Sequence, residues 1–226
     1  MSLPTPYYEQ DGITIYHGDC RDILPLIEPG SIDLVLTDPP YGVDFDTDFT
    51  RFTGGVSAER STHAKVHDDD VDFDPALITN TFARAILFGA NVFSDRLPTG
   101  SWIVWDKRSP GGSKNVMSDG EVAWKSWGHG VYIYAHTWDG FNRASERGTA
   151  HHPTQKPVSL MRWIVNKWSK HGDLILDPYM GSGPIAKACA DTGRRYIGIE
   201  LEERYCEIAA KRLQQSVLPM FAEAAS

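Results

Sequence analysis

The sequence predicts an α/β domain with a mostly parallel sheet that is covered by helices on both faces. Short apolar stretches alternate along the chain with longer amphipathic ones, which is typical of strands that are connected through helices. The length of 226 residues suits one compact domain. A composition that is 41% hydrophobic and 23% charged is that of a globular protein with a buried core.

The predicted elements follow one another in this order. Strands are expected at 13–16, 32–37, 101–105, 131–136, 174–176 and 195–199, and helices at 22–27, 75–87, 158–168, 184–190 and 203–215. The polar stretch 42–74 has no clear periodicity, so we expect a long loop of the kind that is uncommon unless functional. A second break is expected at the glycine-rich stretch 109–113, and the tail after Leu218 is expected to fray.

Composition excludes several classes of protein. No apolar run approaches the roughly 18 to 20 residues that span a bilayer, and the first residues lack the features of a secretory signal. We therefore expect a cytoplasmic protein without a membrane partner. Cys20, Cys189 and Cys206 are an odd number without C-x-x-C spacing, which argues against disulfides and against a zinc site. We expect reduced thiols and no metal.

The net charge of −8 is unevenly distributed. Nine acids and three bases lie within 43–74, whereas 141–171 holds six lysines and arginines against Glu146 alone. Binding of phosphates requires a basic surface of the second kind. A solvated face of mixed charge is the alternative explanation.

A glycine-bearing turn follows the strand in the stretch DLILDPYMGSG, residues 173–183. Such a turn brings backbone N–H groups and a helix N-terminus up to a ligand, and Glu200 ends the next strand where a carboxylate accepts from ribose hydroxyls. The turn lacks the third glycine of a dinucleotide site, and Asp177 would repel a pyrophosphate. The pattern favours a nucleoside ligand that carries a cation, as S-adenosylmethionine does. An ordinary tight turn is the alternative.

The stretch LVLTDPPYG, residues 34–42, ends a buried strand on a rigid turn that offers mainly acceptors. Pro39 and Pro40 have no N–H, so the turn presents the Asp38 carboxylate and backbone carbonyls. An exocyclic amino group of a nucleobase supplies two matching N–H donors, and Tyr41 offers a face for stacking of a flipped base. The alternative is a merely stiff exit from the strand.

Together with HPTQKP at 152–157, these two turns resemble motifs of the amino-methylating DNA methyltransferases. The catalytic turn precedes the cofactor turn, as in the permuted or β class, and GEVAWKSW at 120–127 resembles the small phage-type orphan members. The resemblance implies the S-adenosylmethionine-dependent methyltransferase fold, which is Rossmann-like with a seven-stranded sheet. It further implies one domain over 1–226, with a catalytic half at about 13–140, a cofactor-binding half at about 151–215, and no separate target-recognition domain.

The resemblance also implies residue roles. The catalytic turn comprises Asp38, Pro39, Pro40 and Tyr41. The residues expected to bind S-adenosylmethionine are Asp19, Cys20, Asp38, Thr154, Lys156, Asp177, Pro178, Tyr179, Gly181, Ser182, Gly183 and Glu200. Tyr179 replaces the commoner Phe of the family, and Pro184 and Ile185 replace its usual pair of threonines. Proline is tolerated in the first helical turn but removes an amide donor that could contact the cofactor.

The implied activity is methylation of adenine N6 in double-stranded DNA, as in restriction–modification systems, within a bacterial or phage-infected cell. Cytosine N4 methylation, RNA or protein-glutamine methylation, and non-catalytic DNA binding are the alternatives, and a homodimer is left open. Only a short loop, with Arg143 and Arg147, precedes HPTQKP. We therefore expect these arginines to contact DNA at a short or degenerate site of about two to four base pairs.

Overall fold

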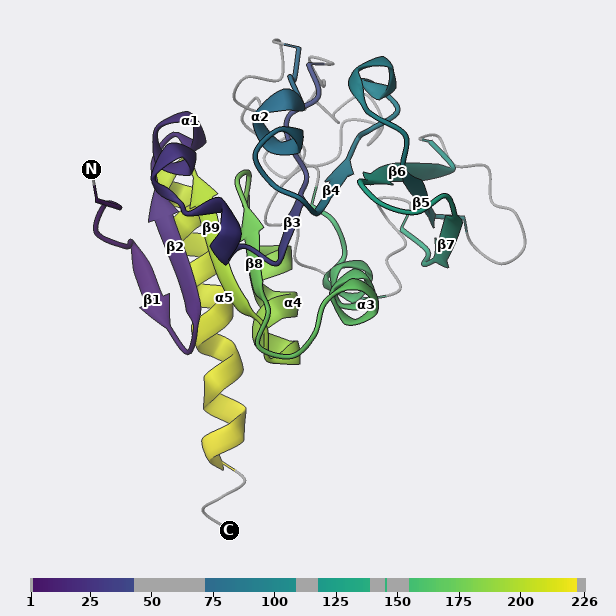
Figure 1. Ribbon diagram of the computed structural model, residues 1–226. Helices are drawn as coiled ribbons and strands as arrows, with labels where there is room; N and C mark the ends of the chain where they lie inside the picture. The colour runs from purple at the N-terminus through teal and green to yellow at the C-terminus, as the bar shows by residue number, and fades with distance from the viewer. Residues whose placement is uncertain (1, 43–71, 109–117, 139–144, 146–154, 223–226) are drawn as a thin grey trace, which may run out of the picture.

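The computed structural model describes residues 2–42, 72–108, 118–138, 145 and 155–222 (Figure 1). Its strands are β1 (Tyr8–Gln10), β2 (Ile13–His17), β3 (Leu34–Thr37), β4 (Ala85–Phe88), β5 (Ser101–Asp106), β6 (Gly120–Lys125), β7 (Val131–Ala135), β8 (Leu174–Asp177) and β9 (Arg195–Glu200). Its α-helices are α1 (Cys20–Ile23), α2 (Ala76–Thr79), α3 (Val158–Trp168), α4 (Pro184–Thr192) and α5 (Glu203–Ala222). Most of the predicted loop at 42–74, and all of 109–113, lie outside the described residues.

All the described strands belong to one sheet with the order β1-β2-β9-β8-β3-β4-β6-β5-β7. β1 pairs antiparallel with β2, and β6 pairs antiparallel with both β4 and β5, while the other pairs are parallel. The sheet is therefore mostly parallel, as predicted. The described residues form nine strands, however, and not the expected seven, and the strands that the sequence pattern did not predict are β1, β4 and β6.

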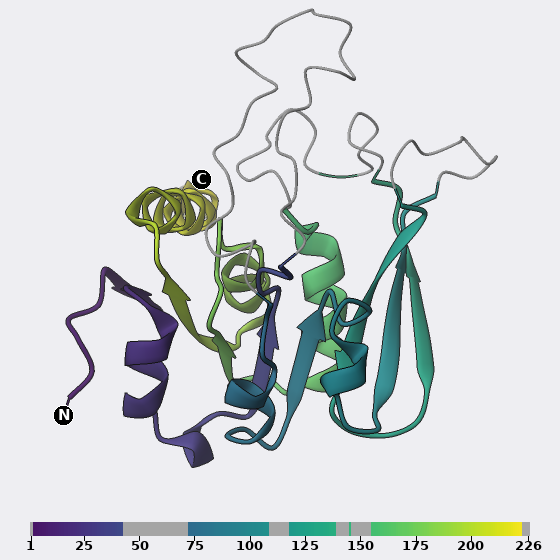
Figure 2. The same ribbon diagram turned by 90° about the horizontal axis from the view of Figure 1, so that it is seen from above.

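Helices cover both faces of the sheet, as the sequence predicted (Figure 2). One apolar cluster lies between the sheet and α3, α4 and α5, and includes Leu36, Ile164 and Ala186. A second cluster lies on the opposite face beneath α1 and α2, and includes Val35 and Ile78. Because neighbouring β3 residues contribute to opposite clusters, a continuous apolar run such as LVL is what a central strand requires.

One predicted element was wrong, and one strand was missed. The stretch 75–87 was expected to be one helix, but it contains only the short α2 and then β4. All four β4 residues are fully buried between the two helical layers, and an apolar run of that kind has no period that distinguishes it from a buried helix. β6 was not predicted as a strand, because its sequence, GEVAWK, carries glycine and two charges.

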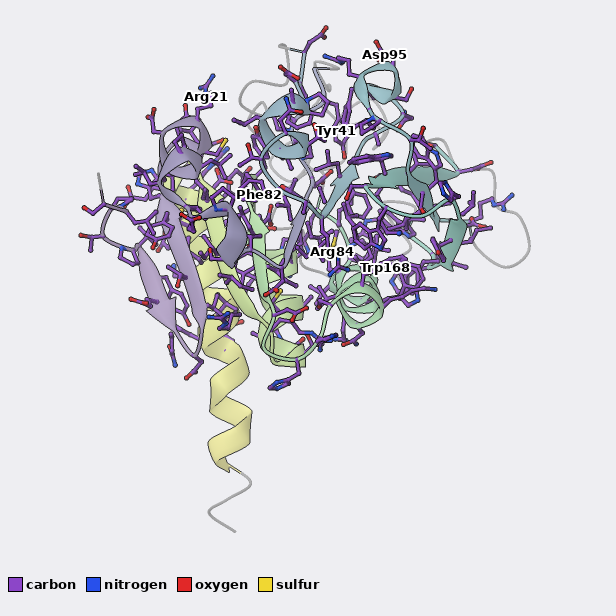
Figure 3. The ribbon with its side chains drawn as sticks, in the orientation of Figure 1. Arg21, Tyr41, Phe82, Arg84, Asp95 and Trp168 are labelled. Carbon is purple, nitrogen blue, oxygen red and sulfur yellow. The ribbon has the colours of Figure 1, made fainter. Side chains whose placement is uncertain are left out.

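α3 begins and ends where the sequence predicted, and α5 continues beyond the predicted end at Gln215. Arg84, directly before β4, donates a hydrogen bond to the carbonyl of Trp168 at the end of α3, with 2.8 Å between the atoms (Figure 3). This contact fixes the end of α3 against the sheet. Among the described residues, no helix combines the length and apolarity that crossing a membrane requires.

Candidate functional site

Three acids lie at the carboxyl ends of neighbouring parallel strands. Asp177 ends β8, Glu200 ends β9, and Asp38 directly follows β3. Since these strands are paired in parallel, their ends meet at one edge of the sheet. That edge is where open α/β sheets bind their ligands.

The turn after β8 is held by Glu200. The Gly181 amide donates to Oε2 of Glu200, and the Glu202 amide donates to Oε1, each at 2.8 Å. Gly181 has a φ of +54°, and a Cβ added there would meet no atom within 4 Å. The Glu200 carboxylate therefore fixes a turn whose outer side is open, and its remaining lone pairs can accept further hydrogen bonds.

Gly183, the second glycine of this turn, lies where a side chain would meet another helix. It has a φ of +74° and precedes Pro184, the first residue of α4, where a missing N–H costs the helix nothing. A Cβ on Gly183 would lie 2.8 Å from the Cβ of Ala209 on α5. Its role in the structure is therefore close packing of α4 against α5.

Asp177 is fully buried beneath this turn. Its Oδ1 accepts from the Thr37 hydroxyl at 2.6 Å and from the Tyr179 amide at 3.3 Å, and its Oδ2 accepts from the Tyr196 hydroxyl at 3.0 Å. Burial raises the pKa of the carboxyl to about 7 although these hydrogen bonds oppose the shift. The structure thus places Asp177 as a brace between β8, β3 and β9.

Asp19 and Cys20 lie beside the same turn. The Gly18 amide donates to the Glu200 carbonyl at 2.9 Å, and the Asp19 carboxylate caps α1 by accepting from the Arg21 amide at 2.8 Å. Burial raises the pKa of both the Cys20 thiol and the Tyr179 hydroxyl, and each group influences the pKa of the other. The hydroxyl that distinguishes Tyr179 from the commoner Phe thus lies near Cys20, which is expected to bind S-adenosylmethionine.

Phe73 is a neighbour of this segment that sequence reasoning missed. Its buried ring meets the Tyr179 ring edge-on, with 5.8 Å between the centroids. Phe73 falls at the end of the acidic stretch 43–74, where nothing in the sequence sets it apart from a loop residue.

Both oxygens of Asp38 have partners in the structure. Oδ1 accepts from the Tyr41 hydroxyl, and Oδ2 accepts from Nζ of Lys156 at 2.5 Å. The side chain of Asp38 remains 20% exposed, whereas that of Lys156 is only 4% exposed. Burial raises the pKa of Asp38, and the Lys156 ammonium opposes that shift.

Tyr41 lies beyond the end of β3, and its ring lies against the backbone of Gly89. Gly89 has a φ of +68°, and a Cβ there would overlap the Tyr41 ring. A side chain at this position is therefore incompatible with the observed place of Tyr41. The Tyr41 hydroxyl also accepts a hydrogen bond from Lys156 at 3.3 Å.

Glu121 on β6 completes this cluster, and sequence reasoning assigned it no role. Its Oε2 lies 3.1 Å from Nζ of Lys156, and its Oε1 pairs with Lys107. Burial alone would lower the pKa of Lys156, but the Asp38 and Glu121 carboxylates raise it well above its ordinary value. The only signal in the sequence was the acid itself. Its part in the cluster becomes visible only once β6 is known to be a strand that lies near the end of β3.

A further contact joins the catalytic and cofactor turns. The Ser182 hydroxyl donates to Oε1 of Gln155 at 3.3 Å, and Gln155 immediately precedes Lys156. Both side chains are buried. The KP end of HPTQKP thus lies between the two predicted turns, while Thr154, Arg143 and Arg147 lie outside the described residues.

Comparison with known proteins finds similar sequences. Residues 124–211 match the model of the N6/N4 DNA methylase family. Type II methyltransferase M2.LlaDCHI of Lactococcus lactis subsp. cremoris is 26% identical over 256 residues, a span that covers 94% of this chain and 93% of that protein. The chain is therefore similar to the N6/N4 DNA methylase family in its C-terminal part, and to a type II methyltransferase over nearly its whole length.

Solved structures agree on the fold. The complex of M1.HpyAVI with SAM is 23% identical with a TM-score of 0.55, and covers 88% of this chain and 99% of that one. The PvuII DNA methyltransferase, described as cytosine-N4-specific, is 15% identical with a TM-score of 0.62, and covers 92% of this chain and 88% of that one. The chain therefore has the predicted methyltransferase fold.

Proposed function

We propose that this chain transfers a methyl group from S-adenosylmethionine to the exocyclic amino group of a flipped adenine, at N6, in double-stranded DNA. The observation that carries the proposal is the place of Asp38. It lies on an acceptor-only turn, next to the glycine turn that Glu200 braces, and keeps one-fifth of its side chain exposed.

The residues present fit S-adenosylmethionine. The open side of Gly181 leaves room for a ligand, and the Glu200 carboxylate is placed to accept from ribose hydroxyls. Cys20, Tyr179 and Phe73, which lie together beside this turn, would border the adenine ring. The cofactor supplies the electrophilic methyl group when it is bound. The described residues contain no cluster of three metal-ligating side chains, and the proposal requires none.

The chain's own contribution is the position of the target amine. Asp38 would accept one N–H of the amine and the Pro39 carbonyl the other, so that the nitrogen lone pair is turned toward the methyl group. This is catalysis by orientation and acceptor hydrogen bonds, without a covalent enzyme intermediate. The Tyr41 ring, fixed against Gly89, would offer a face to the flipped base.

The choice of adenine rests on the Asp at the head of the catalytic turn, which adenine-modifying relatives carry more often. Cytosine N4 is the second candidate, and the favouring observation is the similarity of fold to a cytosine-N4-specific enzyme. We further propose that a single domain performs the reaction, with Arg143 and Arg147 contacting DNA and without a separate recognition domain.

Analysis of the methylated nucleoside tests this proposal. Unmethylated DNA is incubated with the protein and S-adenosylmethionine, digested to nucleosides, and examined by mass spectrometry. We expect N6-methyldeoxyadenosine with the wild type and none with Asp38→Ala. Detection of N4-methyldeoxycytidine instead would show that the target is cytosine and not adenine. Stoichiometric cofactor binding with no methylated nucleoside would favour the non-catalytic DNA-binding alternative.

A further inference from the structure

The cluster around Asp38 is an alternating chain of charges. Lys107 pairs with Glu121, Glu121 lies 3.1 Å from Nζ of Lys156, and Lys156 lies 2.5 Å from Asp38. Lys156 is almost fully buried, and no solvent can replace either of its carboxylate partners there. A buried ammonium of this kind must remain paired, because an uncompensated buried charge is strongly destabilising.

This pairing works against the proposed chemistry of Asp38. The carboxylate must accept an N–H of the target amine, yet the structure gives its Oδ2 to Lys156 and its Oδ1 to Tyr41. An acceptor that already binds an ammonium attracts a neutral donor less strongly. Lys156 therefore needs another acceptor to which it can shift when the target base enters.

We propose that Glu121 is a positioning residue for the methyl transfer. It pairs with the Lys156 ammonium together with Asp38, and so leaves the Asp38 carboxylate available to the target amine. The inference rests on the proposed function, because it assigns Asp38 to the amine. Glu121 is suited to the role since its Oε2 is buried and has, among the described residues, no hydrogen-bond partner beyond this 3.1 Å ion pair.

The electrostatics of the cluster lead to a signature that a purely structural role would lack. The titratable groups described around Asp38 are Lys156, Glu121, Tyr41, Asp177 and, through Glu121, Lys107. Among them Lys156 lowers the pKa of Asp38 and Glu121 raises it. Removing the Glu121 charge should leave Asp38 bound more tightly to Lys156, with a lower pKa.

The experiment compares Glu121→Gln with the wild type and with Glu9→Gln. Glu9 is an exposed acid on β1, an edge strand that is separated from β3 by three other strands, so its replacement makes the same change of charge away from the cluster. We expect Glu121→Gln to lower kcat by about tenfold, a loss typical of disturbed orientation. We also expect the acidic limb of its pH–rate profile to move to lower pH while its affinity for S-adenosylmethionine stays within about twofold of the wild type. Glu9→Gln should match the wild type.

If Glu121→Gln folds poorly because Lys156 loses a partner, the same substitution can be tested in a Lys156→Met background, as a double-mutant cycle. Glu121→Gln should lower kcat no further once Lys156 is Met, because Glu121 acts through the ammonium. An additional loss in that background would overturn the inference. So would a kcat and an acidic limb of Glu121→Gln that equal those of the wild type.

Titration of the Asp38 carboxyl by ¹³C NMR separates this inference from the proposed function. The signal is assigned by its absence in Asp38→Asn. A wild type that methylates no DNA would overturn the proposed function, yet a lower pKa of Asp38 in Glu121→Gln would still support the charge sharing. An unchanged pKa of Asp38, in a wild type that does methylate DNA, would overturn the inference alone.

Discussion

The Gly181 amide donates a hydrogen bond to the Glu200 carboxylate, with 2.8 Å between N and Oε2. One side chain thereby fixes the turn after β8 from the end of β9. The same carboxylate accepts from the Glu202 amide at 2.8 Å, so it also orders the start of α5. A ligand that reaches Glu200 would thus contact a group that is already held in place.

Replacement of Glu200 tests the cofactor site. In Glu200→Ala the turn loses its brace and the ribose loses its acceptor, so the affinity for S-adenosylmethionine should fall by about tenfold or more, as expected for lost charge-assisted hydrogen bonds. Titration calorimetry without DNA measures it. Glu207→Ala, an exposed acid on α5, is the control and should leave the affinity unchanged. Equal affinities in both variants would remove the cofactor site from this turn.

The two glycines of the turn should respond differently to alanine. Gly183→Ala introduces a methyl group 2.8 Å from Ala209, so it should lower the unfolding temperature without ligand. Gly181→Ala also carries the strain of a left-handed residue, about 1 kcal/mol, but its methyl group enters open space. Calorimetric unfolding should therefore show the larger loss for Gly183→Ala. A larger loss for Gly181→Ala would contradict the packing described.

Asp177 should make stability depend on pH. Its folded-state pKa is raised to about 7 by burial, above the value of about 3.9 in the unfolded chain. The folded state therefore binds the proton more tightly, and this stabilisation is present below about pH 4 and is lost as the pH rises toward 7. The linkage is on the order of 4 kcal/mol.

Urea unfolding at several pH values measures this dependence. The free energy of unfolding of the wild type should fall between about pH 4 and pH 7 relative to that of Asp177→Asn, which cannot titrate. A difference between the two proteins that does not change with pH would show that folding leaves the pKa of Asp177 at its unfolded value.

The hydroxyl of Tyr41 should matter besides its ring. The sequence interpretation assigned only a stacking role, for which Tyr41→Phe would be the milder substitution. Because the hydroxyl donates to Asp38 and so fixes the orientation of its carboxylate, we expect Tyr41→Phe to lower kcat several-fold as well, although it frees Oδ1. Tyr41→Ala should lose more, since it also removes the ring that packs on Gly89. Methyl-transfer rates at saturating DNA measure both, and a Tyr41→Phe rate equal to the wild type would leave stacking as the sole role.

DNA binding tests the part of the proposal that the sequence alone supports. If Arg143 and Arg147 each neutralise one phosphate, replacing both by Ala should weaken DNA binding and reduce the slope of log K against log salt by about 1.8. Binding measured at several salt concentrations gives this slope. Mapping of methylation over a genome should show a short or degenerate site, and a strict site of six or more base pairs would contradict it.

Local sequence predicted much of this fold because several elements carry local signals. α3 is one example, since Pro157 precedes it and its apolar residues recur on one face, so both of its ends were predictable. The glycine turn before α4 is another, because Gly183 adopts a left-handed conformation that other residues avoid. The prediction of a helix over the residues of β4 was wrong, because a strand that is buried on both faces shows no hydrophobic period. Only its position in the sheet defines it as a strand.

The parts of the site that depend on distant contacts were not predictable in the same way. Asp38 and Lys156 were recognised by their motifs, but the pair that they form spans 118 residues of sequence. Glu121 lies in the stretch GEVAWKSW, to which no chemical role was assigned, and it enters the cluster only because β6 pairs with β4, next to β3. The hydrogen bond from Tyr41 to Asp38 likewise depends on the packing of the ring against Gly89.

The central claim is that Asp38 acts on the target amine and not on the cofactor. Single-turnover methyl transfer by Asp38→Ala, measured together with its affinity for S-adenosylmethionine, tests this claim most directly. We predict that transfer falls by about a hundredfold or more, as for loss of an acceptor that acts on the reacting group, while the affinity stays within a few-fold of the wild type. A variant that retains most of its transfer rate would contradict the account.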